Sequence, residues 1–163
     1  MKNNILVSLF LSIILTFNVY AAGSSDSGSS KTKTKYDMAV SHINAAKKFE
    51  KNDKLKKAKK RYEKAQKLLI QSNEKFPNKA DTLNYLGFTT RKLGDYEKGE
   101  KYYLQGLAID PIHKGINEYL GELYVATGRH NLAVERLEVL KNCNCKEYED
   151  LKAIIAGEKV SKY

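Results

Sequence analysis

The sequence has few of the residues that usually build catalytic or metal centres. It contains three histidines and two cysteines, and none of His42, His113 and His130 forms a metal-binding pair at helical spacing. We interpret His113 and His130 as solvated turn residues. A phosphate-cradling glycine loop, a Gly-x-Ser-x-Gly elbow and a His-Glu-x-x-His helix are all missing. We therefore expect no catalytic residues, no metal and no cofactor.

Two further absences concern the fold class. Runs of isoleucine, valine and threonine with the period-two alternation of β-strands are missing. Beyond the N-terminal segment, no hydrophobic stretch is long enough to span a membrane. We therefore expect an all-α protein without a transmembrane span once a signal peptide is removed.

The N-terminal segment, residues 1–21, has the pattern of a secretory signal peptide. Lys2 precedes an apolar run from Ile5 to Val19, and Val19 and Ala21 are the small residues of a cleavage site. We predict cleavage after Ala21 and a periplasmic or secreted product, with a Gram-negative bacterium as the expected source. An uncleaved membrane anchor is the alternative. Residues 22–35 are mainly glycine, serine, threonine and lysine, which predicts a flexible leader.

A period of 34 residues is present in the central part of the chain. It is carried by a short motif and by a glycine that each occur twice: Tyr85-Leu86-Gly87 and Tyr119-Leu120-Gly121, and Gly94 and Gly128. A period of this length is typical of helix hairpins that stack on one another.

Residues 80–113 resemble the tetratricopeptide repeat family. The resemblance rests on Leu83 in place of the family's tryptophan, on Leu86-Gly87, on the Gly94-Asp95-Tyr96 turn, on Tyr103 in place of its phenylalanine, and on Pro111. Residues 114–145 follow the same pattern through Leu120-Gly121 and Gly128, although Cys145 stands at the proline position. The resemblance implies a short right-handed α-solenoid of antiparallel hairpins. It also implies that Gly87 and Gly121 lie at helix–helix contacts within their hairpins.

Two more helical segments flank these units. Residues 36–78 predict a first, longer hairpin, whose second helix begins after Asn52-Asp53 as a cap. Its buried stripe is expected to contain Leu55, Ala58, Tyr62, Ala65, Leu69 and Phe76. Residues 147–157 predict a capping helix that covers the last apolar face of the solenoid. The expected domain is therefore residues 36–163, with about three hairpins and one cap.

The resemblance also implies a concave groove lined by the first helix of each hairpin, where the family binds peptides or partner helices. Within it we expect Phe88 to anchor an apolar side chain, Asn84 to hydrogen-bond a peptide backbone and Arg91 to hold a carboxylate. The full set carried over by position is Asp81, Asn84, Phe88, Arg91 and Lys92, followed by Glu118, Glu122, Val125 and Ala126.

Positive charge is concentrated in one part of the chain. The formal net charge is +10, and residues 31–67 contain 14 lysines and arginines against 4 acids. On the helix expected after residue 53, the basic residues lie opposite the apolar stripe and form a basic band: Lys54, Lys56, Lys57, Lys59, Lys60, Arg61, Lys64 and Lys67. The band is either a solubilising face or a docking surface for an anionic envelope component. Nucleic acid is not expected as a partner, because no aromatic stacking platform accompanies the lysines.

Cys143 and Cys145 are the one pair of side chains in the sequence that could form a covalent bond or take part in redox chemistry. A disulfide that ties the last hairpin to the cap, a pair of free thiols, and a redox or metal role are the three alternatives.

The sequence thus favours a non-catalytic scaffold that binds a protein or peptide partner in its groove. Docking to an anionic envelope surface through the basic band is the second hypothesis. Thiol–disulfide exchange at Cys143 and Cys145 is a distant third.

Overall fold

The computed structural model describes residues 33–160, which form seven α-helices and contain no strand. The predicted signal peptide and most of the predicted leader lie outside the described residues. The expected fold class is confirmed, because the described chain is an all-helical arrangement of the tetratricopeptide-like solenoid type. None of the described helices is long and apolar enough to cross a membrane.

The helices follow one another with short connections. In chain order they are α1 (Lys35–Lys51), α2 (Leu55–Lys75), α3 (Ala80–Lys92), α4 (Tyr96–Ile109), α5 (Lys114–Ala126), α6 (His130–Leu140) and α7 (Lys146–Ile155).

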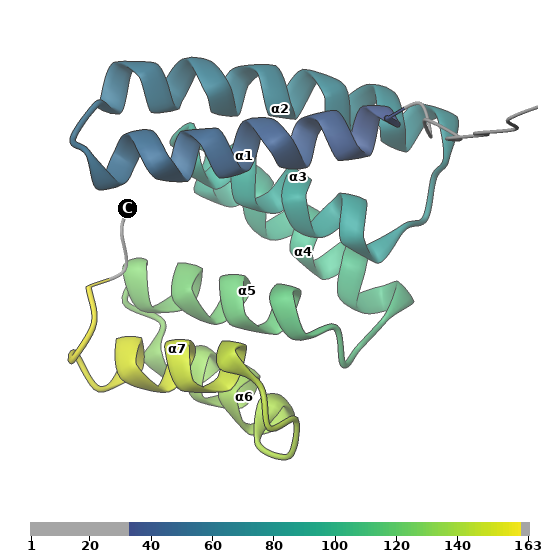
Figure 1. Cartoon of the computed structure of the whole chain (residues 1–163). Helices are drawn as coiled ribbons and strands as arrows, with labels where there is room; N and C mark the ends of the chain where they lie inside the picture. Colours follow the sequence, from purple (N-terminus) through teal and green to yellow (C-terminus); the bar gives the residue numbers. More distant parts are fainter. Residues whose placement is uncertain (1–32, 161–163) are drawn as a thin grey trace, which may run out of the picture. The chain divides into compact units, whose positions relative to one another are not determined.

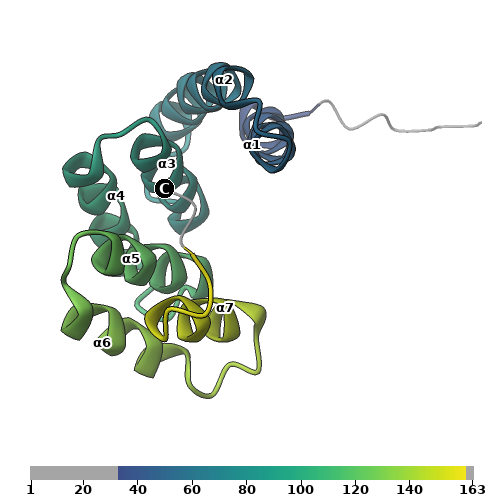
Figure 2. The same cartoon turned by 90° about the vertical axis from the view of Figure 1, so that its left-hand side faces the viewer.

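Within this helical unit the helices form three antiparallel hairpins, α1–α2, α3–α4 and α5–α6, with α7 packed against the third (Figure 1). The end-on view in Figure 2 shows two rows. The inner row consists of α1, α3, α5 and α7, and the outer row consists of α2, α4 and α6. The helix α7 therefore stands where the first helix of another hairpin would stand.

Local sequence sets where the helices begin and turn. Thr34 and Asp37 form a capping box at the start of α1, and Asp95 caps α4 by accepting a hydrogen bond from the Lys98 backbone N–H. The turns inside the second and third hairpins pass through Gly94 and Gly128, whose φ angles of 99° and 75° lie in the left-handed region. Glycine is the residue that adopts this region without steric cost.

The first hairpin departs from the expected pattern at the start of α2. Asn52 is the C-cap of α1, Asp53 adopts a φ of 53°, and Lys54 is the N-cap of α2 without a side-chain hydrogen bond. The predicted Asn52-Asp53 cap is therefore wrong, because this turn ends one helix rather than starting the next.

The predicted stripe of α2 is buried only along the middle of the helix. Leu55 is 64% exposed and Phe76 is 52% exposed. Leu55 borders a hollow beside the end of α3, so no neighbouring helix covers it. The stripe residues that pack into the first core cluster are Ala58, Tyr62, Ala65 and Leu69.

Gly87 lies against the ring of Tyr103, and this contact is within one hairpin, as predicted. A Cβ at Gly87 would lie 2.5 Å from Tyr103 Cε1, so the ring would have to shift to accept a side chain. Gly121 also lies at a helix contact, but its neighbour is Leu151 on α7, 2.6 Å from the position of a Cβ. The predicted contact within the third hairpin is wrong for Gly121, because α7 packs on α5 as a following inner helix.

A disulfide joins Cys143 and Cys145 in the turn between α6 and α7, with a Cα–Cα distance of 5.1 Å. It closes a small ring beside the N-terminus of α7. Leu151 and Ile154 of α7 are buried, so this helix covers the apolar surface of the last hairpin. Among the described residues, the cysteines are therefore bonded rather than free.

Candidate functional site

The inner row of helices lines two adjoining hollows, which we call the groove. The first hollow has a volume of about 550 Å³ and receives side chains from all four inner helices. The second has a volume of about 810 Å³ and shares Glu118, Tyr119 and Glu147 with the first. The charged residues of the first hollow are Lys47, Glu50, Lys51, Lys92, Glu118, Glu122, Lys146, Glu147, Asp150 and Lys159.

Aromatic rings form the floor of the first hollow. The Phe88 ring lies 4.9 Å from the Tyr119 ring, measured between centroids. Lys47 Nζ lies 4.7 Å from the Phe88 ring centroid and donates a hydrogen bond of 3.1 Å to Tyr119 Oη. A cation held over an aromatic face gains electrostatic energy from the ring. Burial lowers the pKa of Lys47, and the carboxylates of Glu118 and Glu122 oppose this shift.

The end of α1 is tied to the groove by a second set of contacts. Lys92 Nζ lies 2.6 Å from Glu50 Oε1, and Tyr62 Oη donates a hydrogen bond of 2.8 Å to Glu50 Oε2. This arrangement links α1, α2 and α3. Lys92 is therefore part of the groove wall and holds the first hairpin against the second.

Arg91 was expected to hold a partner's carboxylate, and the structure corrects this expectation. Its side chain is buried, and its two terminal nitrogens bind the Tyr119 carbonyl at 2.6 Å and Glu122 at 3.1 Å. The guanidinium also lies under the rings of Phe88, Tyr103 and Tyr119. Arg91 lines neither hollow, because the packing of α5 on α3 covers it.

Phe88 and Asn84 also do not have the groove roles expected for them. Phe88 lines the first hollow but is only 4% exposed, so its ring belongs mainly to the core beside Tyr62. Asn84 is buried at the edge of the second hollow, and its amide nitrogen occupies the space that a side chain at Gly115 would need. Neither side chain is an open anchor for a peptide.

The remaining expected groove residues do not all line a hollow. Asp81 is exposed at the second hollow, where its Oδ1 lies 3.1 Å from His113 Nε2. His113 caps α5 by accepting a hydrogen bond from the Ile116 N–H, so it is an ordered residue rather than a solvated one. Val125 and Ala126 line neither hollow.

Glu118 has the most perturbed carboxylate in the groove. It is 8% exposed and lines both hollows. Burial, with the nearby carboxylates of Glu122, Asp150 and Glu147, raises the pKa of Glu118 to about 8, while Lys47 acts in the opposite direction. A carboxyl that is removed from water and surrounded by like charges retains its proton to higher pH.

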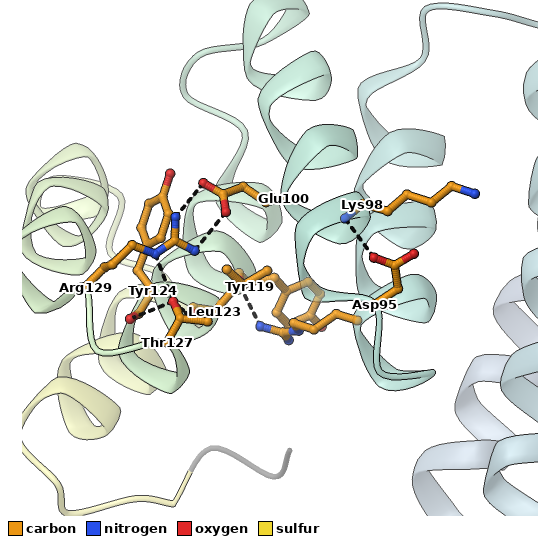
Figure 3. A network of polar contacts seen from close by, with 9 residues as sticks. Asp95, Lys98, Glu100, Tyr119, Leu123, Tyr124, Thr127 and Arg129 are labelled. Carbon is orange, nitrogen blue, oxygen red and sulfur yellow. Dashed lines mark hydrogen bonds and ion pairs between the residues drawn. The ribbon is translucent and has the colours of Figure 1, made fainter.

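Polar contacts on the outer row fix the third hairpin against the second. Arg129, the N-cap of α6, binds both carboxylate oxygens of Glu100 on α4 at 2.9 and 2.8 Å, and its Nε binds Thr127 (Figure 3). The guanidinium also lies 4.5 Å from the Tyr124 ring centroid. A bidentate pair of this kind has a defined geometry, so it orients the start of α6 relative to α4.

The basic band lies on α2, away from both hollows. Seven of its eight members are exposed, and Arg61 is half-buried because its guanidinium contacts His42 Nδ1 at 3.0 Å. None of the eight forms an ion pair with a carboxylate in the described part of the chain.

Sequence reasoning missed the groove residues contributed by α1 and α7. Lys47, Glu50, Glu147 and Asp150 all line the first hollow. The predicted capping helix could have indicated the residues of α7, because a helix that follows the last hairpin takes the place of another inner helix. Its polar face then points to the same side as those of α3 and α5.

Residues 80–113, which contain α3 and α4, match the family model described as tetratricopeptide repeat. No curated protein matches the chain. Repeats of this family generally act as non-catalytic scaffolds that bind other proteins. The match therefore shows a tetratricopeptide repeat in the segment that contains α3 and α4, and the hairpins on either side of it have the same all-helical arrangement.

Proposed function

We propose that the protein is an exported scaffold, without catalytic activity, that binds an extended segment of a protein partner in the groove. The observation that carries this proposal is the groove itself, because four helices present side chains to one hollow of about 550 Å³ that continues into a second. Concave sites with aromatic floors and a few placed polar groups are the usual form of binding sites.

The chemistry of the lining supports a peptide rather than a small apolar ligand. Charged side chains of both signs surround the Phe88 and Tyr119 rings, and several of them reach solvent. An extended peptide offers backbone amides and alternating side chains to such a surface. Because the groove crosses successive hairpins, it can contact several consecutive residues of one segment.

A peptide selection tests this proposal. Random dodecapeptides displayed on phage are selected against the full chain, and the affinities of synthetic copies are then measured by calorimetry. A paired charge swap in the groove, Lys51→Glu with Glu147→Lys, leaves the net charge unchanged. We expect it to weaken binding of the selected peptides by about tenfold or more.

The matched control is the swap Glu97→Lys with Lys101→Glu, which reverses an exposed ion pair on α4 outside both hollows. It should leave the affinities unchanged within about twofold. Equal loss in both swaps, or no loss in the groove swap, would contradict peptide binding in the groove.

Export is part of the proposal and is supported by the sequence of residues 1–21. The mass of the protein recovered from the periplasm or the medium tests it. The expected mass corresponds to a chain that begins at Ala22. A protein that retains residues 1–21 in the membrane fraction would contradict cleavage and favour an anchor.

The basic band supports a second candidate function, docking to an anionic envelope surface. The specific observation is that its lysines are exposed and form no ion pairs with described carboxylates. Binding of the full chain to vesicles that contain phosphatidylglycerol should then fall steeply as the salt concentration rises from about 50 to about 300 mM. This range spans about 0.1 M, where salt begins to screen the attraction between exposed charges strongly. The quadruple change of Lys56, Lys60, Lys64 and Lys67 to Glu should abolish it. Binding that is insensitive to salt and to these changes would exclude this function.

A further inference from the structure

Two carboxylates in the groove differ from all the others that line it. Glu118 and Glu147 form no ion pair and no side-chain hydrogen bond with any described residue. Each of the other acids that line the hollows has a partner: Glu50 binds Lys92 and Tyr62, Glu122 binds Arg91, Asp150 binds Lys146 and Lys159, Asp81 binds His113, and Asp110 accepts from the Ile112 N–H.

These two carboxylates also share one location. Glu118 and Glu147 line both hollows, so they lie where the hollows join. Glu118 is more than nine-tenths buried, and Glu147 is half-buried on the adjacent helix α7. Lys47 and Lys51 of α1 line the first hollow and form no ion pair with Glu118 or Glu147. The ammonium of Lys47 is directed to Tyr119 Oη and the Phe88 ring.

A carboxylate largely removed from water is stabilised when a cation pairs with it, and no described cation does this for Glu118. We propose that Glu118, assisted by Glu147, accepts the ammonium or guanidinium group of a lysine or arginine side chain from the peptide segment that occupies the groove. This inference rests on the proposed groove function and names the chemistry of its ligand. A divalent metal ion suits the position less well, since two carboxylates supply fewer oxygen ligands than calcium or magnesium takes.

The charges around Glu118 give this site a pH dependence. On its own helix it faces Glu122, α7 contributes Glu147 and Asp150, and α1 contributes Lys47. Two more cations are nearby but engaged: Arg91 of α3 binds Glu122, and Lys146 of α7 binds Asp150. Since the pKa of Glu118 is raised to about 8, the carboxylate becomes fully charged only above this pH. A lysine side chain, with a usual pKa of about 10.4, remains protonated there. Affinity for a cationic peptide should therefore rise between pH 6.5 and pH 9.

The experiment uses the peptides selected on the full chain at pH 8.5. We expect them to share a lysine or arginine at one position. Replacement of that residue by norleucine, which keeps the chain length and removes the charge, should weaken binding by about tenfold or more. With the Glu118→Gln variant, the same replacement should change the affinity by less than about threefold. The matched control, Glu97→Gln, removes an equivalent charge from the exposed surface of α4 and should behave as the wild type.

The pH profile separates a binding role from a structural one. The affinity of the wild type for the lysine peptide should increase several-fold from pH 6.5 to pH 9, whereas that of Glu118→Gln should stay flat. Circular dichroism checks that the variant is folded. If it is not, Glu147→Gln at the half-buried position and the norleucine peptide still test the pairing.

Suppose that selected peptides lose affinity in the charge-swap variant and so bind in the groove, yet share no lysine or arginine or are unaffected by norleucine. That outcome would overturn this inference and leave the proposed function intact. Failure of every peptide to bind, or binding that ignores the charge swap, would remove the proposed function and this inference with it.

Discussion

Arg91 on α3 and Glu122 on α5 form an ion pair of 3.1 Å that is almost completely removed from solvent, with side-chain exposures of 0% and 8%. The pair joins the second hairpin to the third at the first hollow, which Glu122 lines. The Tyr119 carbonyl adds a third point of contact to the same guanidinium.

Replacement of Arg91 by Met should destabilise the protein by about 3 to 5 kcal/mol, because Glu122 then remains buried without its cation. The free energy of unfolding in urea measures this loss. Arg129→Met is the matched control, since its ion pair with Glu100 is partly exposed and should contribute roughly 1 kcal/mol or less. Similar losses in the two variants would contradict a special role for the buried pair.

Replacement by alanine should change the stability of the protein differently at Gly87 and at Gly121, the two glycines at helix contacts. At Gly87 the new methyl meets the rigid ring of Tyr103 rather than the end of a flexible chain, so we expect a loss of about 1 to 3 kcal/mol. At Gly121 the methyl meets the flexible end of Leu151, and the gain in helix propensity, roughly 1 kcal/mol, should offset the crowding. Thermal unfolding of the two variants side by side tests the contrast, and a larger loss at Gly121 would be inconsistent with these contacts.

The stability of the protein should depend on pH through Glu118. Its folded-state pKa of about 8 lies above its usual value of 4.5, so the folded protein holds a proton that the unfolded chain releases. This contribution is complete below about pH 4.5 and is lost as the pH rises towards 8. The Glu118→Gln variant cannot ionise at this position, so its advantage over the wild type should grow to the order of a few kcal/mol at pH 9. Urea titrations at pH 5 and pH 9 give the comparison, and a constant difference between the two proteins would show that the raised pKa is wrong.

Reduction of the disulfide between Cys143 and Cys145 should have a modest effect. The ring that it closes contains very few residues, so the chain-entropy model gives a contribution of roughly 1 to 2 kcal/mol. The melting temperature with and without a reductant measures it, with the Cys143→Ser and Cys145→Ser double variant as a control that the reductant should not affect. Complete unfolding on reduction would mean that the ring has a larger role in holding α7.

The sequence predicted the helices better than the surfaces. The 34-residue spacing and the turn glycines Gly94 and Gly128 place helix boundaries, since they depend on local geometry that any hairpin of this type needs. The role of Leu55 was not predictable in this way, because its exposure depends on where the neighbouring hairpin ends.

In the groove, too, the sequence predicts what depends on position along a helix and not what depends on how the helices pack. Position within the repeat correctly brings Lys92, Glu118 and Glu122 to the first hollow. It does not reveal that Arg91 lies below the surface, since this depends on how closely α5 approaches α3. The position of Glu147 in the groove could be predicted only if α7 were known to pack as a fourth inner helix. That packing is visible in the contact between Gly121 and Leu151.

The position of α7 also has a consequence for the modular design of such chains. Because each unit of a stacked array contacts only its neighbours, the joint between Leu140 and Lys146 is a natural insertion point. An additional hairpin placed there, with a small residue facing Leu151 as Gly121 does now, would lengthen the inner row by one helix while the first three hairpins keep their contacts. Under the proposed function, the length of the peptide segment that the groove can hold is thus adjustable at a single site.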